Sequence, residues 1–534
     1  MTDFTFFMPK QEKSDKPLKN ILPMILVILD GWGLAAANKG NAIFLSKTPT
    51  MDGLIKKYPN TKIYAHGKYV GLPGFQSGNS EAGHMNIGAG RVVEQDAVKI
   101  SKSINDGTFL KNAGFIEAIR HVKKNKSRLH LMGMISNGMS AHSDPDHLLA
   151  LMSLAREKGV GEVYLHLFTD GRDSPKYVSL KLIADIQKAF KNGEAIATVM
   201  GRFYAMDRKK AWERTKEAYD ALVDGAGRKA ESAQAAITES YNRGESDEFV
   251  EPYIIMKDGR PLPRIASGDS VIFFNLRSDR ARQLAKFFVQ KDLCELNKSC
   301  FTRKKFLKDL LFVAMTDFGP DLDSILTAFP SADLKKTLPM QLKDLRQLYI
   351  AETEKYAHVT YFFNGGFADP VNGEARRVIP SPDVKSYDAT PAMSSNGLTK
   401  EILDNLAKKK YDFTVLNFAA PDMIGHTGNL SAGIECCHEV DKCLGEIVKA
   451  YLRASGTILI TADHGNIEEM VNLKTGEIDT EHSSNQVPFI AVNKNMAAKA
   501  KLRSNGVLAD VAPTILKLLG FDQPEEMTGQ SLIK

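Results

Sequence analysis

Short apolar runs that end abruptly in charged residues recur along this chain. The run from Thr457 to Thr461, Thr-Ile-Leu-Ile-Thr, has the length and the β-branched content of a buried strand. Asp463 and His464 follow it almost at once, and a Gly-Asn turn signal comes next. Binding sites in open α/β sheets lie at the carboxyl ends of parallel strands. The pattern therefore predicts a buried parallel strand that ends in two metal-competent side chains.

The same arrangement recurs in three other parts of the chain. The runs 23–29 and 413–418 are each followed by acidic residues, and a histidine precedes the run 487–492. The metal-competent residues at these places are Asp30, Asp422, His426, Asp463, His464 and His482. Carboxylate and imidazole ligands together suit Mn²⁺, Zn²⁺ or Fe²⁺ better than Ca²⁺. Because three Asp and three His can divide between two ions, we expect a two-metal site of the kind that clamps the oxygens of a phosphoryl transfer.

A glycine-rich polar loop, residues 71–84, leads into an expected helix. Ser80 lies at this junction, where its hydroxyl could be presented beside helix N–H groups, a geometry suited to phosphate. The alternative is that Ser80 only caps the helix. The spacing Gly78-x-Ser80-x-x-Gly83 is one residue too long for a hydrolase nucleophile elbow, so that motif is excluded.

Between residue 95 and about residue 325, apolar runs alternate with helical patterns, which predicts a second α/β unit. Four of these runs, 129–135, 163–168, 195–200 and 270–275, are followed by a histidine or by Arg and Asp residues. These residues are His142, Arg172, Asp173, Arg202, Arg208, Arg277 and Arg280. Guanidinium groups bind phosphate and carboxylate bidentately. We therefore expect this unit to bind a small polyanion.

The remaining patterns indicate how the domains follow one another along the chain. Proline and glycine breaks over 320–345 predict a return linker. Lys355 lies just before an expected strand, where it could bind phosphate or simply pair in solvent with Glu352 or Glu354. Because the metal candidates come from both ends of the chain and the Arg set from its middle, we expect a metal domain built from both ends with the anion-binding domain inserted.

Other stretches predict the elements around these strands. Residues 41–58 predict a helix with Pro49 inside it or at its start, and residues 62–65 predict a short strand. A closing helix is expected over 510–519.

Length, composition and net charge restrict the classes to which this protein can belong. A chain of 534 residues is too long for one hydrophobic core, so two or more domains are expected. With 43% hydrophobic and 25% charged residues, the composition is that of a soluble globular protein. The net charge of +6 is mild, and short Lys/Arg runs fit solvated helix faces better than a nucleic-acid site. The mild positive charge fits acidic small-molecule ligands equally well.

The cysteines and the N-terminus predict a cytoplasmic location. The five cysteines show no paired-ligand spacing, and those at 436–443 follow a helical pattern, so core or partly buried thiols in a reducing compartment are expected. No apolar stretch approaches the ~20 residues that a membrane span needs. Residues 1–21 are polar and Lys-rich without a signal-peptide core, which predicts a flexible extension.

Several motifs together resemble one family, the cofactor-independent (2,3-bisphosphoglycerate-independent) phosphoglycerate mutases of the alkaline phosphatase superfamily. The resemblance covers nearly the whole chain after the extension. It rests on the motifs at residues 29–33, 78–84, 170–173, 201–208, 273–280, 351–355, 421–428 and 461–466. It implies two α/β domains joined by two linkers, usually monomeric and closing over the substrate. The implied boundaries are 22–94 with 328–534 for the phosphatase-like metal domain and 95–327 for the inserted substrate domain.

The resemblance also implies roles for individual residues. Ser80 would be the nucleophile that becomes a phosphoserine, Asp173 the general acid and base, and Lys355 a cation beside the phosphoryl group. One ion would be held by Asp30, Ser80, Asp463 and His464, and the other by Asp422, His426 and His482. The implied substrate-binding residues are His142, Arg172, Asp173, Arg202, Arg208, Arg277, Arg280, Lys355 and Glu354.

The expected reaction is the interconversion of 3-phosphoglycerate and 2-phosphoglycerate. It would use two divalent ions, with Mn²⁺ favoured over Mg²⁺, Co²⁺ or Zn²⁺, and no 2,3-bisphosphoglycerate. The expected partner is this small-molecule substrate alone, with no nucleic acid, no membrane and a monomeric state.

One segment departs from the family pattern. The stretch 136–144 has one extra residue and lacks the last His of the family's motif. His142 still aligns when it is counted back from His147, but the shape of the loop is open.

Two other classes of protein remain possible at this point. A metal-dependent phosphomonoesterase or phosphopentomutase would share the metal motifs but would not need the Arg-Asp set of the middle unit. A non-catalytic, nucleic-acid-binding protein would bind its partner without metal and would tolerate Ser80→Ala.

Overall fold

The computed structural model describes residues 21–74, 76–138, 140–191, 193–319, 321–322, 324–330, 334–496 and 501–534. The chain divides into two compact units. Unit 1 takes residues up to 94 and from 332 onward, and unit 2 takes residues 95–331. Apart from Ile21, the extension expected over residues 1–21 lies outside the described residues. No helix among the described residues is long and apolar enough to span a membrane.

Unit 1 is built on an eight-stranded sheet in the order β13-β12-β14-β1-β15-β16-β2-β17. Strands β13, β12, β14, β1 and β15 are parallel, whereas β16 is antiparallel to both of its neighbours. The strands are β1 (Met24–Leu29), β2 (Asn60–Tyr64), β12 (Gln347–Glu352), β13 (Ala375–Ile379), β14 (Phe413–Phe418), β15 (Thr457–Thr461), β16 (Val487–Val492) and β17 (Gly506–Val507). The apolar runs therefore form strands at the expected places.

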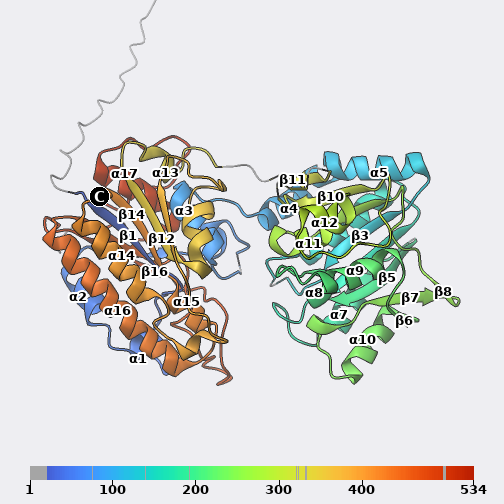
Figure 1. Ribbon diagram of the computed structural model, residues 1–534, viewed down its shortest axis with the longest axis horizontal. Helices are drawn as coiled ribbons and strands as arrows, with labels where there is room; N and C mark the ends of the chain where they lie inside the picture. Colours follow the sequence, from blue (N-terminus) through green and yellow to red (C-terminus); the bar gives the residue numbers. More distant parts are fainter. Residues whose placement is uncertain are drawn as a thin grey trace, which may run out of the picture. The chain divides into compact units, whose positions relative to one another are not determined.

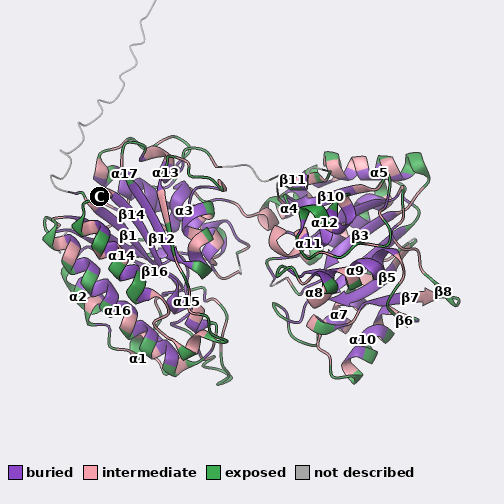
Figure 2. Ribbon diagram, in the orientation of Figure 1, coloured by how far each residue is buried: buried purple, intermediate pink, exposed green. Residues whose placement is uncertain are grey.

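Helices cover both faces of this sheet, which explains why its central strands are apolar throughout. All residues of β1, β14 and β15 are buried (Figure 2). In Figure 1, α2, α14 and α16 lie together on one side of the strands, and α3, α13 and α17 on the other. The helices of unit 1 are α1 (Ala42–Leu45), α2 (Pro49–Lys57), α3 (Ser80–Ala89), α13 (Leu338–Gln341), α14 (Ser395–Ala407), α15 (Ala420–Gly425), α16 (Leu430–Arg453) and α17 (Val511–Leu519).

The helix predicted over residues 41–58 is divided in two. Asn41 caps α1 by accepting a hydrogen bond from the Phe44 N–H at 3.0 Å, and α1 ends after one turn. Pro49 then occupies the first position of α2. Proline is favoured there because its missing N–H would have no helical partner.

The expectation of a strand after Lys355 is wrong. Lys355 follows strand β12, and the residues beyond it form a π-helix, His358–Phe362. Their β-branched and aromatic content favours a strand, but tertiary packing overrides that preference. The Phe363 carbonyl approaches Gly88 of α3 so closely that no side chain fits there. The segment therefore packs as a helix against α3 and does not extend the sheet.

Unit 2 contains a nine-stranded sheet in the order β11-β10-β9-β3-β4-β5-β7-β6, with β8 paired to β7. Its strands are β3 (Leu129–Met134), β4 (Val163–Thr169), β5 (Glu194–Gly201), β6 (Arg228–Ala230), β7 (Tyr253–Lys257), β8 (Arg260–Pro261), β9 (Ser270–Phe273), β10 (Leu311–Thr316) and β11 (Leu326–Phe329). Strand β11 lies inside the stretch 320–345 that was expected to be a linker. Its pairing with β10 makes it an edge strand of this sheet.

Two apolar cores lie on opposite faces of the unit 2 sheet. Leu129 and Leu131 of β3 pack into one core, and the alternate residues Met132 and Met134 pack into the other. The helices are α4 (Asp96–Asn105), α5 (Ala113–Asn125), α6 (Pro145–Glu157), α7 (Ser179–Lys188), α8 (Arg202–Ala205), α9 (Trp212–Val223), α10 (Ala233–Asn242), α11 (Ser278–Val289) and α12 (Leu293–Leu296).

A chain of buried polar side chains crosses this sheet. Oδ2 of Asp269 lies 3.1 Å from Nε2 of His130, whose Nδ1 lies 2.9 Å from Nε2 of His166. Nδ1 of His166 lies 2.9 Å from the Thr198 hydroxyl. Burial lowers the pKa of both histidines. With both rings neutral, each hydrogen can point along the chain toward Asp269, and every bond is satisfied.

This chain should make stability depend on pH. The folded pKa values of His130 and His166 lie below the unfolded value of about 6.5, so the unfolded state binds more protons below that pH. The free energy of unfolding should therefore fall as the pH falls below about 6.5. Urea unfolding of wild type and His166→Leu between pH 5 and pH 7 tests this, because the variant should show a shallower dependence. Substitution of the exposed His438 should leave the pH dependence of the free energy of unfolding unchanged. A His166→Leu variant with the same pH dependence as wild type would contradict the prediction.

Candidate metal centre and anion site

The sheet order of unit 1 brings three predicted aspartates together. Strand β1 lies between β14 and β15 with all three parallel, so their carboxyl ends meet at one edge. Asp30, Asp422 and Asp463 follow these three strands and are buried. Three carboxylates so close together repel one another unless positive charge lies between them.

One group of ligand atoms comes from Asp30, Asp463 and His464, which lie within 4.8 Å of one another. Nε2 of His464 is 3.4 Å from Oδ1 of Asp30 and 3.6 Å from Oδ2 of Asp463. This Asp463 oxygen is buried and accepts no hydrogen bond from the described residues, although Nδ1 of His84 lies 3.2 Å from it. A buried carboxylate oxygen without a donor costs free energy, and a bound cation would remove that cost.

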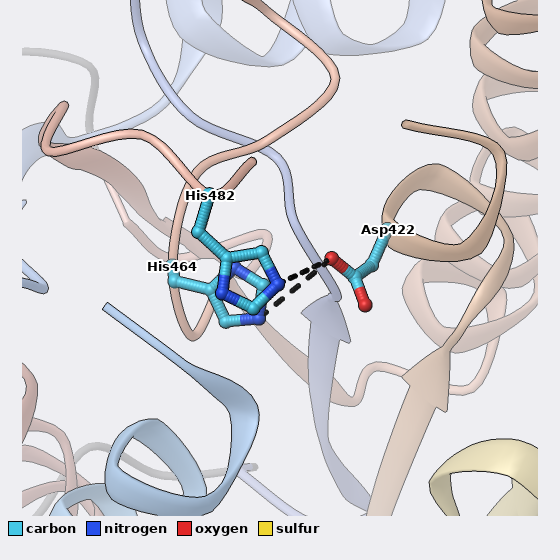
Figure 3. A group of neighbouring side chains, drawn as sticks. All are labelled: Asp422, His464 and His482. Carbon is cyan, nitrogen blue, oxygen red and sulfur yellow. Dashed lines mark ion pairs between the residues drawn. The ribbon is translucent and has the colours of Figure 1, made fainter. Parts of the chain in front are cut away.

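The other group comes from Asp422, His464 and His482 (Figure 3). Oδ1 of Asp422 lies 3.2 Å from Nε2 of His482 and 3.4 Å from Nε2 of His426. Figure 3 shows the His464 and His482 rings turned toward the Asp422 carboxylate. The two groups share His464, and His426 lies beside Asp422, so the six predicted residues form one continuous centre.

The tautomers of two histidines favour a cation in this second group. Nδ1 of His482 lies 2.8 Å from the Gly78 carbonyl oxygen, and Nδ1 of His426 lies 2.8 Å from the Thr480 carbonyl oxygen. A carbonyl can only accept, so each Nδ1 carries a hydrogen, and the neutral form of each ring has its lone pair on Nε2. The two Nε2 atoms are only 3.0 Å apart. Two lone pairs that converge beside a carboxylate are the donor set of a divalent ion.

Lys355 adds positive charge to this centre. Its Nζ lies 2.7 Å from Oδ1 of Asp30, 2.6 Å from Oδ2 of Asp422 and 2.6 Å from Oγ of Ser80. Burial alone would lower the pKa of Lys355, but Asp30, Asp422 and Asp463 raise it above its usual value. The alternative of a solvated Lys355 is therefore wrong: the side chain is buried within the carboxylate cluster.

Ser80 is the first residue of α3, but it does not cap that helix. Asn79 is the cap, and its side chain accepts a hydrogen bond from the Ala82 N–H at 2.9 Å. The Ser80 hydroxyl instead lies 3.2 Å from Oδ1 of Asp30 and 3.0 Å from Nε2 of His464. The capping alternative is therefore wrong, and the hydroxyl faces the carboxylate-imidazole cluster.

Three residues that the sequence interpretation left without a role support these side chains. Asn417, inside β14, donates to Oδ2 of Asp30 at 2.6 Å and lies 3.0 Å from Nε2 of His84. His84 in turn lies 2.8 Å from the Ser80 carbonyl oxygen. Asn466 donates to Oδ1 of Asp422 at 2.9 Å. Asn417 is a polar residue inside a mostly apolar strand, and His84 and Asn466 lie in the motifs at 78–84 and 461–466; these were the available signals.

In unit 2, Arg202 and Asp173 lie together at the carboxyl ends of β5 and β4. Nη1 of Arg202 donates to Oδ2 of Asp173 at 2.9 Å and also to Asp170. The Ser140 hydroxyl donates to the same Asp173 oxygen at 2.7 Å. Burial would raise the pKa of Asp173, but Arg202 and then Ser140 lower it. Asp173 is therefore ionised in the free protein.

His142 also belongs to this cluster. Its carbonyl accepts a hydrogen bond from the Leu276 N–H at 2.8 Å, and its N–H donates to the Ser140 hydroxyl at 3.2 Å. Burial, with the charges of Arg277 and Arg202, lowers the pKa of His142 to about 3. The divergent loop 136–144 thus still places a neutral His142 beside the arginines.

The other arginines surround Arg280 with positive charge. Arg208 donates to Oδ2 of Asp279 at 2.7 Å, while Arg280 donates to a backbone carbonyl. Burial, followed by the charges of Arg202, Arg208 and Arg172, lowers the pKa of Arg280 to about 10. An excess of guanidinium charge around the buried Arg202 and the partly buried Arg280 suits an anion.

Two predicted residues lie at the margin of these clusters. Glu354 is exposed, and its Oε1 accepts a hydrogen bond from the Tyr387 hydroxyl at 2.7 Å rather than contacting the metal-competent residues. Nη1 of Arg172 lies 3.8 Å from Oε1 of Glu248, a loose ion pair that leaves much of the guanidinium in solvent.

Comparison with known proteins gives a consistent result. The family model described as the Metalloenzyme superfamily matches residues 22–523. The 2,3-bisphosphoglycerate-independent phosphoglycerate mutase of Clostridium kluyveri is 49% identical over 518 residues, 96% of this chain and 99% of the relative. The protein of the same name from Moorella thermoacetica is 48% identical over 96% of this chain and 98% of its own. The structure of Leishmania mexicana phosphoglycerate mutase at low cobalt concentration matches with a TM-score of 0.80 and 29% identity, over 97% of this chain and 99% of that chain.

The two-unit α/β fold and the carboxylate-imidazole centre define a metal-dependent enzyme of the Metalloenzyme superfamily. Within that superfamily, the chain belongs to the family of 2,3-bisphosphoglycerate-independent phosphoglycerate mutases.

Proposed function

We propose that this protein interconverts 3-phosphoglycerate and 2-phosphoglycerate through a phosphoserine at Ser80, without 2,3-bisphosphoglycerate. The observation that carries the proposal is the position of the Ser80 hydroxyl, 2.6 Å from Nζ of Lys355 and 3.0 Å from Nε2 of His464. A hydroxyl buried among metal-competent residues and one cation can attack a phosphoryl group. Family membership supports the same reaction.

Two divalent ions are proposed at the carboxylate-imidazole centre, one on Asp30, Ser80, Asp463 and His464 and one on Asp422, His426 and His482. The donor-free Asp463 oxygen and the converging His426 and His482 lone pairs support this fit. Bound there, the ions would supply positive charge that lowers the pKa of the serine hydroxyl and neutralises phosphoryl oxygens. Mixed carboxylate and imidazole donors suit Mn²⁺, with Mg²⁺, Co²⁺ or Zn²⁺ as alternatives.

The chain's own groups perform the remaining steps. Ser80 attacks the phosphoryl group, and Lys355 neutralises charge on its oxygens. Asp173 gives a proton to the departing C3 oxygen and later takes one from the C2 hydroxyl. Arg202 holds the Asp173 pKa low in the free protein, so a substrate carboxylate that shares Arg202 would weaken this effect and let Asp173 hold the proton.

The arginine cluster of unit 2, with His142 and Arg172, is proposed to retain the glycerate carboxylate between the two transfers. Water must be excluded during that time, because otherwise the phosphoserine would hydrolyse. We further propose a cytoplasmic monomer whose partner is this substrate, with no nucleic-acid or membrane role. We propose no direct role for Glu354 in catalysis.

The test is an enolase-coupled assay on 3-phosphoglycerate without added 2,3-bisphosphoglycerate. Activity should disappear after EDTA treatment, return with Mn²⁺ and be absent in Ser80→Ala. Metal-dependent phosphate release without mutase activity would instead indicate a phosphatase. Absence of both activities would overturn the proposal and leave a binding protein.

Substitution of Arg280 should weaken substrate binding more than turnover. Arg280→Met removes a guanidinium group that is repelled by the like charges of Arg202, Arg208 and Arg172. The fold should therefore lose little stability. Loss of a charged hydrogen bond of about 1.5–3 kcal/mol should raise KM for 3-phosphoglycerate by about 10- to 100-fold.

The matched control is Arg282→Met on the same helix. Arg282 pairs with Asp321 at 2.8 Å and should leave KM unchanged. An unchanged KM in Arg280→Met, measured with the coupled assay, would contradict an anion site at this arginine.

A further inference from the structure

Glu468 is a fully buried acidic residue that lies a few positions after the Asp463-His464 pair. Its Oε2 accepts hydrogen bonds from the Gly33 N–H at 3.0 Å and from the Asn466 N–H at 2.8 Å. Its Oε1 accepts from the Ser483 hydroxyl and from Nδ2 of Asn485 at 3.0 Å. An ionised carboxylate has about four acceptor positions, so these four donors use its capacity. Glu468 is therefore a support and is not itself a metal ligand.

The donors belong to three separate segments, each of which carries proposed metal ligands. Gly33 lies three residues after Asp30, in the loop that leaves β1. Asn466 lies two residues after His464, and Ser483 directly follows His482. One carboxylate thus connects the loops that carry ligands of both groups.

The backbone around Glu468 is shaped to admit the carboxylate. A Cβ atom at Gly33 or at Gly465 would overlap Oε1 of Glu468. The Ser483 N–H also donates to the Gly465 carbonyl at 2.9 Å, so the two ligand-bearing loops form a short bridge at this point. The two glycines are therefore needed where the loops close around the carboxylate.

We propose that Glu468 is a positioning residue that fixes the Asp30, Asp463-His464 and His482 segments in their ligand geometry before metal binds. The inference rests on the proposed function only in that these segments carry its metal ligands. Supports of this kind commonly affect metal affinity by about 10- to 100-fold.

Glu468→Asp is the informative variant, because it keeps the charge but shortens the side chain by one methylene. The shorter carboxylate cannot reach the two backbone N–H groups and the Ser483 hydroxyl together. Isothermal titration of the metal-free protein with Mn²⁺ should show about 10- to 100-fold weaker binding. In the coupled assay, excess Mn²⁺ should restore most of kcat, which a general folding defect would not permit.

Glu468→Gln is the conservative rescue. Its amide oxygen can still accept from the Gly33 and Asn466 N–H groups, and its NH₂ can donate to the Ser483 hydroxyl after that hydroxyl rotates. Mn²⁺ affinity should therefore lie between those of wild type and Glu468→Asp. Glu469→Gln is the matched control, because the neighbouring Glu469 is exposed and accepts one hydrogen bond from Asn485 at 3.2 Å.

Ser483→Ala tests the same connection should Glu468→Asp fail to fold. It removes the Ser483 hydrogen bond to Glu468 and keeps the Asn485 bond from the same segment, and it should also weaken Mn²⁺ binding. Wild-type affinity in a folded Glu468→Asp or in Ser483→Ala would overturn the inference while leaving the proposed function intact. A wild-type protein that binds none of Mn²⁺, Mg²⁺, Co²⁺ and Zn²⁺ would overturn the proposed function, and this inference with it.

Discussion

Replacing Ser80 with alanine should abolish the mutase reaction, with kcat falling by at least about 10⁴-fold, because substrate binding cannot replace a lost nucleophile. The hydroxyl lies 2.6 Å from Nζ of Lys355 and 3.2 Å from Oδ1 of Asp30, at the first position of α3. Alanine is compatible with that helical position, and Asn79 still caps the helix, so the fold should persist. The enolase-coupled assay measures the loss, and circular dichroism checks the fold.

Ser179→Ala provides the matched control for this experiment. Ser179 is also buried at the first position of a helix, α7, but it belongs to unit 2 and is not one of the predicted site residues. It should retain wild-type kcat. Activity above a thousandth of wild type in folded Ser80→Ala would show that another group accepts the phosphoryl.

The strands and the acidic residues at their ends could be predicted because both depend on local pattern. A strand buried on both faces must be apolar along its length, so β1, β14 and β15 are visible as apolar runs. The first charged residue after such a run lies at the edge of the sheet. Asp30 and Asp463 were found in this way.

The order of the strands could not be predicted from the same pattern. Strand β1 lies between β14 and β15, which begin 389 and 433 residues after it, and this pairing alone brings the three aspartates together. Nothing in an apolar run indicates which strand will lie beside it in the sheet. The resemblance to a family implied which residues share an ion, but it did not give the order of the strands.

Side-chain orientation was also beyond local pattern. Lys355 follows a strand and could have faced solvent, yet it is buried between Asp30 and Asp422. The π-helix after it forms because the backbone at Phe363 packs against Gly88, a contact between residues far apart in sequence. Glu468 was missed for the same reason, since its four donors come from loops that only the fold assembles.

Lys355→Met should separate metal binding from catalysis. The ammonium lies 2.7 Å from Oδ1 of Asp30 and 2.6 Å from Oδ2 of Asp422, oxygens that we propose as metal ligands. It therefore competes with the ions for these carboxylates, and its removal should leave Mn²⁺ affinity equal to or tighter than that of wild type. The turnover rate should nevertheless fall by at least about 10³-fold, because a cation beside the phosphoryl group is lost.

The metal-free variant should also be less stable than wild type. Without the ammonium, three buried carboxylates remain with His464 as their compensating charge. Burial would lower the His464 pKa, but these carboxylates raise it to about 9. The Tm of metal-free Lys355→Met should drop and should rise toward wild type when Mn²⁺ is added. Lys56→Met, an exposed position on α2, should show neither effect. Weaker Mn²⁺ binding in Lys355→Met would mean that the lysine organises the ligands rather than competing with the ions.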